Sequence, residues 1–204
     1  VRLLAALNKP DLGMQQLESL VKQDVSLSVR VLRFVNSAAI PIRTEVGTIG
    51  QALVLIGMEP IRKWASVWCL AGLNAGAPEL ATLALVRARS CELIGERTKG
   101  LEAPELFLVG LFSLLDVMLS RSMGDVLDNL PLSPSTADAL LGRDNRERAT
   151  LDAVIAYESG EWDHVSDVAR LAGVDTTALP AAYTAALRWA QEVARGGIIS
   201  PPSP

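Results

Sequence analysis

Apolar side chains recur every three or four residues along most of the chain, and Pro and Gly interrupt this spacing at intervals. Such spacing is typical of helices that bury one face, and no segment shows the sustained alternation of a strand. The fold class is therefore predicted to be all-α, with Ser26 and Thr48 as helix caps and a disordered tail at 196–204. The predicted helices cover approximately residues 2–8, 13–23, 26–39, 49–57, 60–73, 79–98, 103–120, 124–130, 134–141, 145–158, 162–172 and 177–195.

The stretch VLRFVNSAAI (31–40) keeps this helical spacing but places a polar pair, Asn36 and Ser37, in its middle. Asn and Ser side chains favour caps and turns over the interior of a helix. We expect these two side chains to hydrogen-bond backbone groups of the 41–48 loop or of a neighbouring helix, because unpaired buried polar groups cost about 1–3 kcal/mol each. The alternative is a surface that contacts a partner or ligand and that also includes Arg33, Arg43, Arg62 and Trp64.

The composition supports helices and limits the classes of partner. Half of the 204 residues are hydrophobic but only 4% are aromatic, so the core must consist mostly of Leu, Val and Ala. The chain is long enough for one well-buried core, or for two small lobes that share one. Residues 1–100 carry 12 Lys and Arg against 8 Asp and Glu, whereas residues 101–204 carry 7 against 15. A net charge of −4 with this asymmetry argues against nucleic-acid binding and favours docking onto a protein partner.

Two pairs of side chains are expected to be buried. Trp64 and Trp68 lie one helical turn apart, so they either stack in the core or present an interface, and we favour the core. Cys69 and Cys91 fall in apolar helical segments without the spacing of a redox or metal motif. Buried reduced thiols of this kind are typical of a cytoplasmic protein.

The longest apolar run, LFLVGLFSLLDVML (106–119), is shorter than the ~20 residues of a membrane span and contains Ser113 and Asp116. This run indicates a buried core helix, and no secretory signal opens the chain. The expected location is therefore the cytoplasm, without membrane contact. Because the chain starts at Val1 rather than Met, we expect it to be a piece of a longer protein or a processed product.

The residue types do not supply the ligands or nucleophiles of a familiar enzyme class. The one histidine, His164, cannot build the multi-histidine metal site of a helical metallohydrolase, and we interpret it as a solvated loop residue. Neither a Gly-rich phosphate loop nor a nucleophile elbow is present. We therefore expect no catalytic residue, no metal and no cofactor.

The segment VSDVARLAGVDTTALPAAY (165–183) resembles the helix-turn-helix of LacI-type repressors through its DVARLAGV part. Pro180 falls inside the equivalent of the recognition helix, where it would remove an amide donor and clash with the preceding turn. No Lys or Arg lies between Val174 and Leu187 to contact phosphates or guanine. DNA binding is therefore not expected.

Four segments, in this order, resemble the HDOD domain, a non-catalytic relative of the HD and HD-GYP phosphohydrolases. They are LNKPDLGMQQLESLVKQDVSLSVRVLRFVNSAAI (7–40), VGTIGQALVLIGMEPIRKWASV (46–67), LVRARSCELIGE (85–96) and LFLVGLFSLLDVML (106–119). The last two resemble a subgroup in which the HDOD domain follows an EAL domain, the fold of cyclic-di-GMP phosphodiesterases. The resemblance implies an all-α, HD-like bundle of helices, which we expect over residues 1–195.

The resemblance also implies that the metal ligands of an active HD domain are missing. Such a domain has His-Asp in the helix that matches GLFSLLD, where this chain has Ser113 and Leu114. An upstream His-Ser of the HD domain aligns with Arg89 and Ser90. Leucine cannot ligate a metal, and arginine stays protonated and repels one. We expect Ser113 and Leu114 to lie on a buried helix, where they contribute to packing.

The function that the resemblance implies is a non-enzymatic regulatory or protein-interaction module in bacterial signal transduction, linked to cyclic-di-GMP. Its partners would be other signalling domains, including an EAL domain before Val1, and a homodimer is also compatible. The alternative is a nucleotide sensor that keeps the old phosphohydrolase cleft, in which Arg89 and neighbouring arginines hold phosphate. A residual metal-dependent phosphodiesterase is a third class, which we do not expect.

Overall fold

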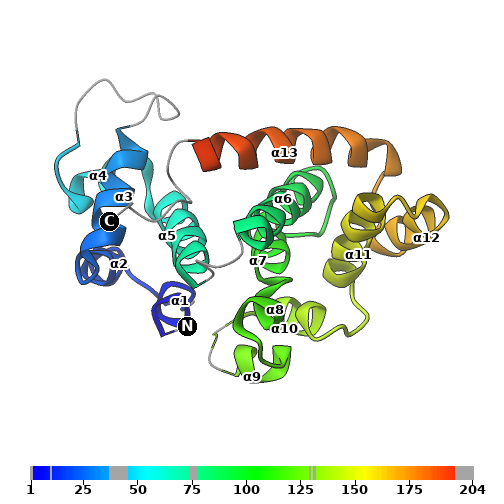
Figure 1. Ribbon diagram of the computed structural model, residues 1–204, viewed down its shortest axis with the longest axis horizontal. Helices are drawn as coiled ribbons and strands as arrows, with labels where there is room; N and C mark the ends of the chain where they lie inside the picture. Colours follow the sequence, from blue (N-terminus) through cyan, green and yellow to red (C-terminus); the bar gives the residue numbers. More distant parts are fainter. Residues whose placement is uncertain are drawn as a thin grey trace.

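The computed structural model describes residues 2–9, 11–36, 46–73, 78–128, 130 and 132–195. Over these residues the chain forms thirteen α-helices and one short 3-10 helix, and no strand occurs among them (Figure 1). The all-α prediction is confirmed. The predictions for Ser37, Arg43 and the 196–204 tail lie outside the described residues.

The helices form two groups along the chain. The N-terminal group, in blue to cyan in Figure 1, consists of α1 (Arg2–Leu7), α2 (Met14–Lys22), α3 (Val25–Val35), α4 (Ile49–Ile56) and α5 (Met58–Leu73). The second group consists of α6 (Pro78–Gly95), α7 (Ala103–Phe112), α8 (Leu115–Leu119), α9 (Met123–Leu127), α10 (Pro134–Leu140), α11 (Arg146–Ser159), α12 (Trp162–Ala172), the 3-10 helix η1 (Thr176–Ala178) and α13 (Leu179–Arg195). α6 packs along α7 and α13, and α11 packs along α12. α13 runs past α6 and back toward α5 (Figure 1).

Two apolar clusters hold these helices together. The first extends through α1–α5 and continues into α6, α7 and α13, so it joins the two groups. The second lies within the second group, between α6, α7, α11, α12 and α13. The chain therefore has two lobes that share one of its cores, which is one of the two arrangements that its length allows.

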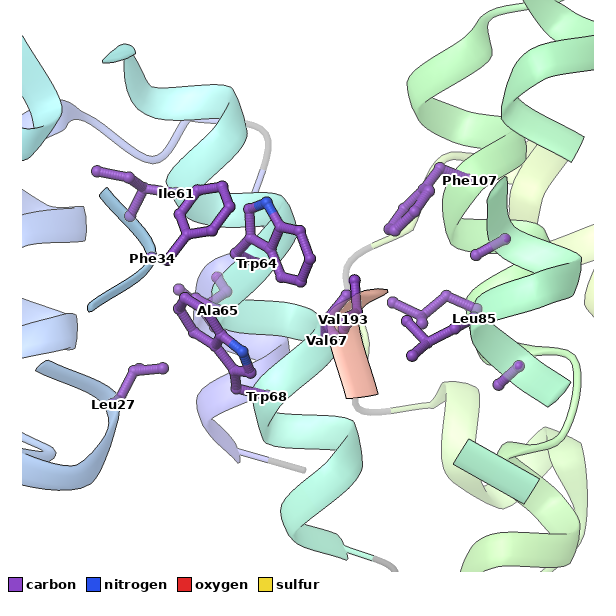
Figure 2. Packing of buried hydrophobic residues seen from close by; sticks show 14 of the residues in the cluster. Leu27, Phe34, Ile61, Trp64, Ala65, Val67, Trp68, Leu85, Phe107 and Val193 are labelled. Atoms are coloured by element: carbon purple, nitrogen blue, oxygen red, sulfur yellow. The ribbon is translucent and has the colours of Figure 1, made fainter. Parts of the chain in front are cut away.

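Aromatic rings connect α3, α5, α7 and α13 within the first cluster. Figure 2 shows the rings of α3, α5 and α7. The ring of Trp64 in α5 lies 4.6 Å from that of Phe34 and 5.6 Å from that of Trp68, between centroids. It also lies 5.5 Å from the ring of Trp189, which meets Phe107 at 6.4 Å. Trp64 and Trp68 are both buried, so their predicted place in the core is confirmed.

The start of α4 follows its sequence signals. Thr48 Oγ1 accepts a hydrogen bond from the Gln51 N–H, and the Gln51 side chain accepts one from the Thr48 N–H, which forms a capping box. Gly57 ends this helix with a φ of +85°, a conformation that favours glycine. The cap predicted for α3 is wrong, because Asp24 rather than Ser26 accepts from the N–H three residues into the helix.

The helix predicted over 103–120 is broken between α7 and α8. Ser113 and Leu114 lie in the turn between these helices and are half-buried, so their predicted place on a buried helix is wrong. The apolar run before the turn is core, as predicted, and Phe112 is fully buried. The Ser113 hydroxyl donates to the Gly110 carbonyl at 2.8 Å, which satisfies one of the free carbonyls at the end of α7.

α6 and α7 approach each other closely at Gly110. A Cβ atom on this residue would lie 2.5 Å from the backbone nitrogen of Ala88 and 2.6 Å from its Cα. The backbone of α6 therefore occupies the space that any other side chain would need. This contact holds α7, and with it Phe107, beside α6.

α12, η1 and the start of α13 cover the segment that resembles a repressor motif. Pro180 is the second residue of α13, where proline is tolerated because the amide there needs no partner within the helix. The argument that Pro180 breaks this helix is therefore wrong, whereas the absence of Lys and Arg over 175–187 stands. His164 is exposed, as expected, but it lies in α12 and not in a loop.

Candidate functional site

A pocket of about 770 Å³ lies between α5 and the second group of helices. The α5 wall includes Arg62, Lys63 and Ser66. Further lining residues come from α7, from the start of α10 and the segment before it, and from α6 through Glu92. A volume of this size is typical of small-molecule sites.

Lys63 connects α5 with α6 and α7. Its Nζ lies 2.5 and 2.7 Å from the two carboxylate oxygens of Glu92, and 4.1 Å from the centroid of the Phe107 ring. Burial lowers the pKa of Lys63 below its usual value, although the facing Glu92 carboxylate opposes this shift. Lys63 and Glu92 thus form a partly buried ion pair between α5 and α6.

Arg89 does not line the pocket. Its guanidinium donates to the Glu92 carboxylate at 2.6 Å and lies 3.5 Å from a carboxylate oxygen of Glu96. These ion pairs already use the cation that we expected to hold phosphate. Arg89 therefore helps to fix Glu92, and through it Lys63.

Two donors on α5 are not used within the fold. Neither the Arg62 Nε–H nor the Ser66 hydroxyl has a hydrogen-bond partner in the part of the chain that the structure describes. Ser66 is fully buried, and Arg62 has a weak ion pair with Glu59, at 3.5 Å. Because the two residues are four positions apart on one helix, their side chains share a face. Both donor atoms are buried, so they lie behind the accessible surface of the pocket.

Hydroxyl groups surround a carboxylate at the start of α7. The Ser133 and Ser135 hydroxyls each lie 3.0 Å from Oε2 of Glu105, which accepts from both. Ser133 also caps α10, since its oxygen accepts from the Thr136 N–H. These bonds fix the carboxylate of Glu105 where the start of α7 meets the start of α10.

The charges that line the pocket nearly cancel. Its carboxylates are Glu59, Glu92 and Glu105, and its cations are Arg62 and Lys63. The pocket therefore has no excess of positive charge with which to attract a ligand that carries several phosphates.

Among the residues that the structure describes, the predicted contact residues do not form one surface. Arg33 is exposed on α3, and the side chain of Asn36 bonds the backbone of Val46, which confirms its predicted internal role. Arg62 and Trp64 line the pocket, the latter from within the core. The predicted surface is thus divided between a structural contact and a pocket.

Several pocket residues were not predicted from the sequence. They are Lys63, Ser66, Glu92, Glu105, Phe107 and Ser133. The one local signal is the Arg62–Lys63 pair, a double charge within the otherwise apolar stretch IRKWASVW. Ser113 and Leu114 are not among the residues that line the pocket, so the positions of the missing HD ligands do not form it.

Cys91 is free and buried, as predicted, and burial raises the pKa of its thiol to about 12. The side chain of Cys69 lies outside the described part of the structure. Within the described ranges, no group of three or more His, Cys, Asp and Glu side chains is arranged to hold a metal ion. Among the same residues, no helix combines the length and hydropathy needed to cross a membrane.

In a comparison with protein families, residues 1–134 match the HDOD domain. The chain is 29% identical over 191 residues to an uncharacterized protein, YuxH, of Bacillus subtilis. It is 31% identical over 189 residues to a protein of Vibrio cholerae named cyclic di-GMP phosphodiesterase CdgJ. Both alignments cover 92% of this chain but only 46% and 44% of the relatives, so the chain spans less than half of their length.

Among solved structures, the crystal structure of an HDOD domain protein with unknown function from Geobacter sulfurreducens is similar to this chain. The TM-score is 0.48 at 20% sequence identity. The match covers 84% of this chain and 67% of the other.

Proposed function

This chain belongs to the HDOD domain family, and we propose that it is a non-catalytic regulatory module in cyclic-di-GMP signalling that acts by binding other signalling domains. The link to cyclic-di-GMP is suggested by the relative named cyclic di-GMP phosphodiesterase CdgJ. We infer the absence of a catalytic role from the residues that stand at the positions of the HD metal ligands.

The residues at those positions have structural roles in this fold. The Ser113 hydroxyl donates to the end of α7, and Leu114 packs against the first apolar cluster. The Arg89 guanidinium pairs with Glu92, and a fixed positive charge repels a metal ion. These contacts support a scaffold that binds partners in preference to one that performs metal-dependent hydrolysis.

Regulation of this kind works by differential binding. A contact that is stronger with one state of a partner domain increases the population of that state without any chemical step. The partner that we propose is an EAL domain in the same polypeptide, because the relatives are more than twice as long as the region that matches this chain. The net charge of −4 is the reason that nucleic acid is not among the proposed partners.

A second candidate function is a small-molecule sensor, and the pocket favours it. Its volume of about 770 Å³ and its mixed lining of apolar and charged side chains are typical of a small-molecule site. A ligand held there would supply the signal that the module transmits. The two functions are compatible, because a sensor can regulate a partner domain.

The non-catalytic role is tested by incubating the purified chain with cyclic di-GMP and either Mg²⁺ or Mn²⁺. An active EAL phosphodiesterase under the same conditions serves as the positive control. We expect no linear dinucleotide above the protein-free blank, and no stoichiometric metal by elemental analysis. Turnover that a chelator abolishes and that persists through repurification would overturn the proposal.

A further inference from the structure

We infer that the pocket lined by α5, α7 and the start of α10 binds an organic cation with an apolar body, such as a protonated amine attached to a ring system. This inference deepens the sensor role proposed above and rests on it. Its support comes from an accessible carboxylate without a cationic partner, from the apolar side chains beside that carboxylate, and from the balance of charges in the lining.

Glu105 supplies the carboxylate. It lines the pocket and is partly exposed. Within the described ranges, its hydrogen bonds come from the Ser133 and Ser135 hydroxyls, both to Oε2, and no Lys, Arg or His forms an ion pair with it. Oε1 is not among the unpartnered polar atoms that are buried, so it is accessible. Because a carboxylate has about four lone-pair sites in all, Oε1 can accept from a ligand.

Apolar side chains lie close to this carboxylate. Leu108 follows Glu105 by three positions on α7, so the two residues share a helix face. Leu132 and Pro134 adjoin Ser133, whose hydroxyl lies 3.0 Å from the Glu105 carboxylate. Each of these apolar residues lines the pocket and is at least partly exposed. A ligand with its charge at Glu105 would therefore cover apolar surface with the rest of its body.

The charges that line the pocket leave one negative charge in excess. The ion pairs are Lys63–Glu92 at 2.5 Å, Arg62–Glu59 at 3.5 Å and, outside the lining, Arg89–Glu96 at 3.5 Å. Glu105 is the charge of the lining that remains. A carboxylate beside apolar surface is less screened than one in open water, so it attracts a cation and repels an anion more strongly.

A ligand in this pocket would influence how the two helix groups pack. Pro60 of α5 and Leu108 of α7 both line the pocket, so a molecule of sufficient size contacts both groups. Its binding favours the arrangement of the groups in which both contacts form. Such a shift in population is a signal that a partner domain can bind differentially.

Isothermal titration calorimetry at neutral pH with tryptamine, tryptophol and indole-3-propionate tests the inference. These compounds share an indole body and carry an ammonium, a hydroxyl and a carboxylate group, respectively. We expect tryptamine to bind the purified chain at one site with a Kd below about 1 mM. Tryptophol should bind at least about fivefold more weakly, because its hydrogen bond to Glu105 is not charge-assisted. Indole-3-propionate should bind more weakly still, because its charge is repelled.

Variants locate the cation at Glu105. Glu105→Gln keeps the size of the side chain and an acceptor but removes the charge, so it should weaken tryptamine binding by at least about fivefold and change tryptophol binding by less than about twofold. Glu102→Gln is the matched control, because Glu102 is exposed near the start of the same helix and does not line the pocket. Its affinity for tryptamine should stay within about twofold of wild type. Circular dichroism checks that each variant is folded.

If Glu105→Gln does not fold, Leu108→Trp takes its place, because a larger side chain should fill the pocket and abolish tryptamine binding. The inference is overturned if tryptamine shows no saturable binding, or if Glu105→Gln and Glu102→Gln weaken it equally. Binding of tryptophol or indole-3-propionate as tight as that of tryptamine would overturn the assignment of a cation, although it would still support the sensor role. None of these results would affect the non-catalytic role, which the hydrolysis assay tests separately.

Discussion

Asn36 joins the end of α3 to the segment that leads into α4. Its Nδ2 donates to the Val46 carbonyl at 2.9 Å, and its Oδ1 accepts from the Val46 N–H at 2.8 Å. Nδ2 also donates to the Leu32 carbonyl at 2.9 Å. Val46 is itself buried in the first apolar cluster, so these bonds fix a core residue through its backbone. Asn36 as a whole is exposed, which differs from the buried amide that the sequence suggests.

Replacement of Asn36 by Leu removes all three bonds. The bond to Leu32 is exposed, so water can replace it at little cost. The two bonds to Val46 are part-buried, and a hydrogen bond of this kind contributes about 0.5–1.5 kcal/mol. We therefore expect Asn36→Leu to lower the free energy of unfolding by about 1–3 kcal/mol. For a chain of this length, that loss corresponds to a fall in Tm of roughly 2–12 °C.

Urea unfolding and thermal melting, both followed by circular dichroism, measure this effect. Asn36→Asp should be intermediate, because it keeps the acceptor for the Val46 N–H but loses the donor. Arg33→Ala is the control on the same helix, and because Arg33 is exposed its Tm should stay within roughly a degree or two of wild type. If Asn36→Leu melted like wild type but lost binding to a partner or ligand, the structural role of Asn36 would be refuted. The 31–40 stretch would then belong to a functional surface.

Three further predictions concern the packing of the second helix group. In urea unfolding, Gly110→Ala should destabilise the fold by about 1–3 kcal/mol or more, because the new methyl group meets the backbone of α6. Gly124→Ala, in open surroundings, should cost less than about 1 kcal/mol. Equal effects of the two variants would contradict the close contact. Glu158→Gln breaks a largely buried ion pair and should lower the free energy of unfolding by about 3–5 kcal/mol. Asp167→Asn, in an exposed pair, should lower it by less than about 1 kcal/mol. The reverse order in the same assay would refute this reasoning. Cys91 should escape alkylation at pH 8 in the native protein, because it is buried and its thiol pKa is raised to about 12. Mass spectrometry of the peptide that contains Cys91 measures the labelling. Rapid labelling would contradict the burial of this thiol.

Features that depend on neighbouring residues could be predicted from the sequence. The cap of α4 is such a feature, because Thr48 and Gln51 are three positions apart and bond within one turn. Asp24 and Ser26 are both good caps, so the start of α3 depends on where the chain turns, which the sequence does not show. The break after Phe112 has no Pro or Gly at the turn itself, so no local residue signal marks it.

The pocket could not be predicted in the same way, because its walls come from segments far apart in the chain. Ser66 and Glu105 meet the same space only after α5 and α7 have packed. The ion pair of Arg89 with Glu92 is different, because the two residues are three positions apart on one helix. That spacing alone favours a pair, and it would have excluded Arg89 as a free phosphate contact.

The most direct test of a non-catalytic regulatory role measures the hydrolysis of cyclic di-GMP by the product of the full open reading frame that encodes this chain. The same protein without residues 1–195 and residues 1–195 alone are assayed beside it. We expect kcat/KM of the full protein to change by at least about fivefold when the module is removed, which is the lower end of typical coupling between sites. Residues 1–195 alone should show no turnover. An unchanged kcat/KM, or chelator-sensitive hydrolysis by residues 1–195 alone, would contradict a regulatory role without catalysis.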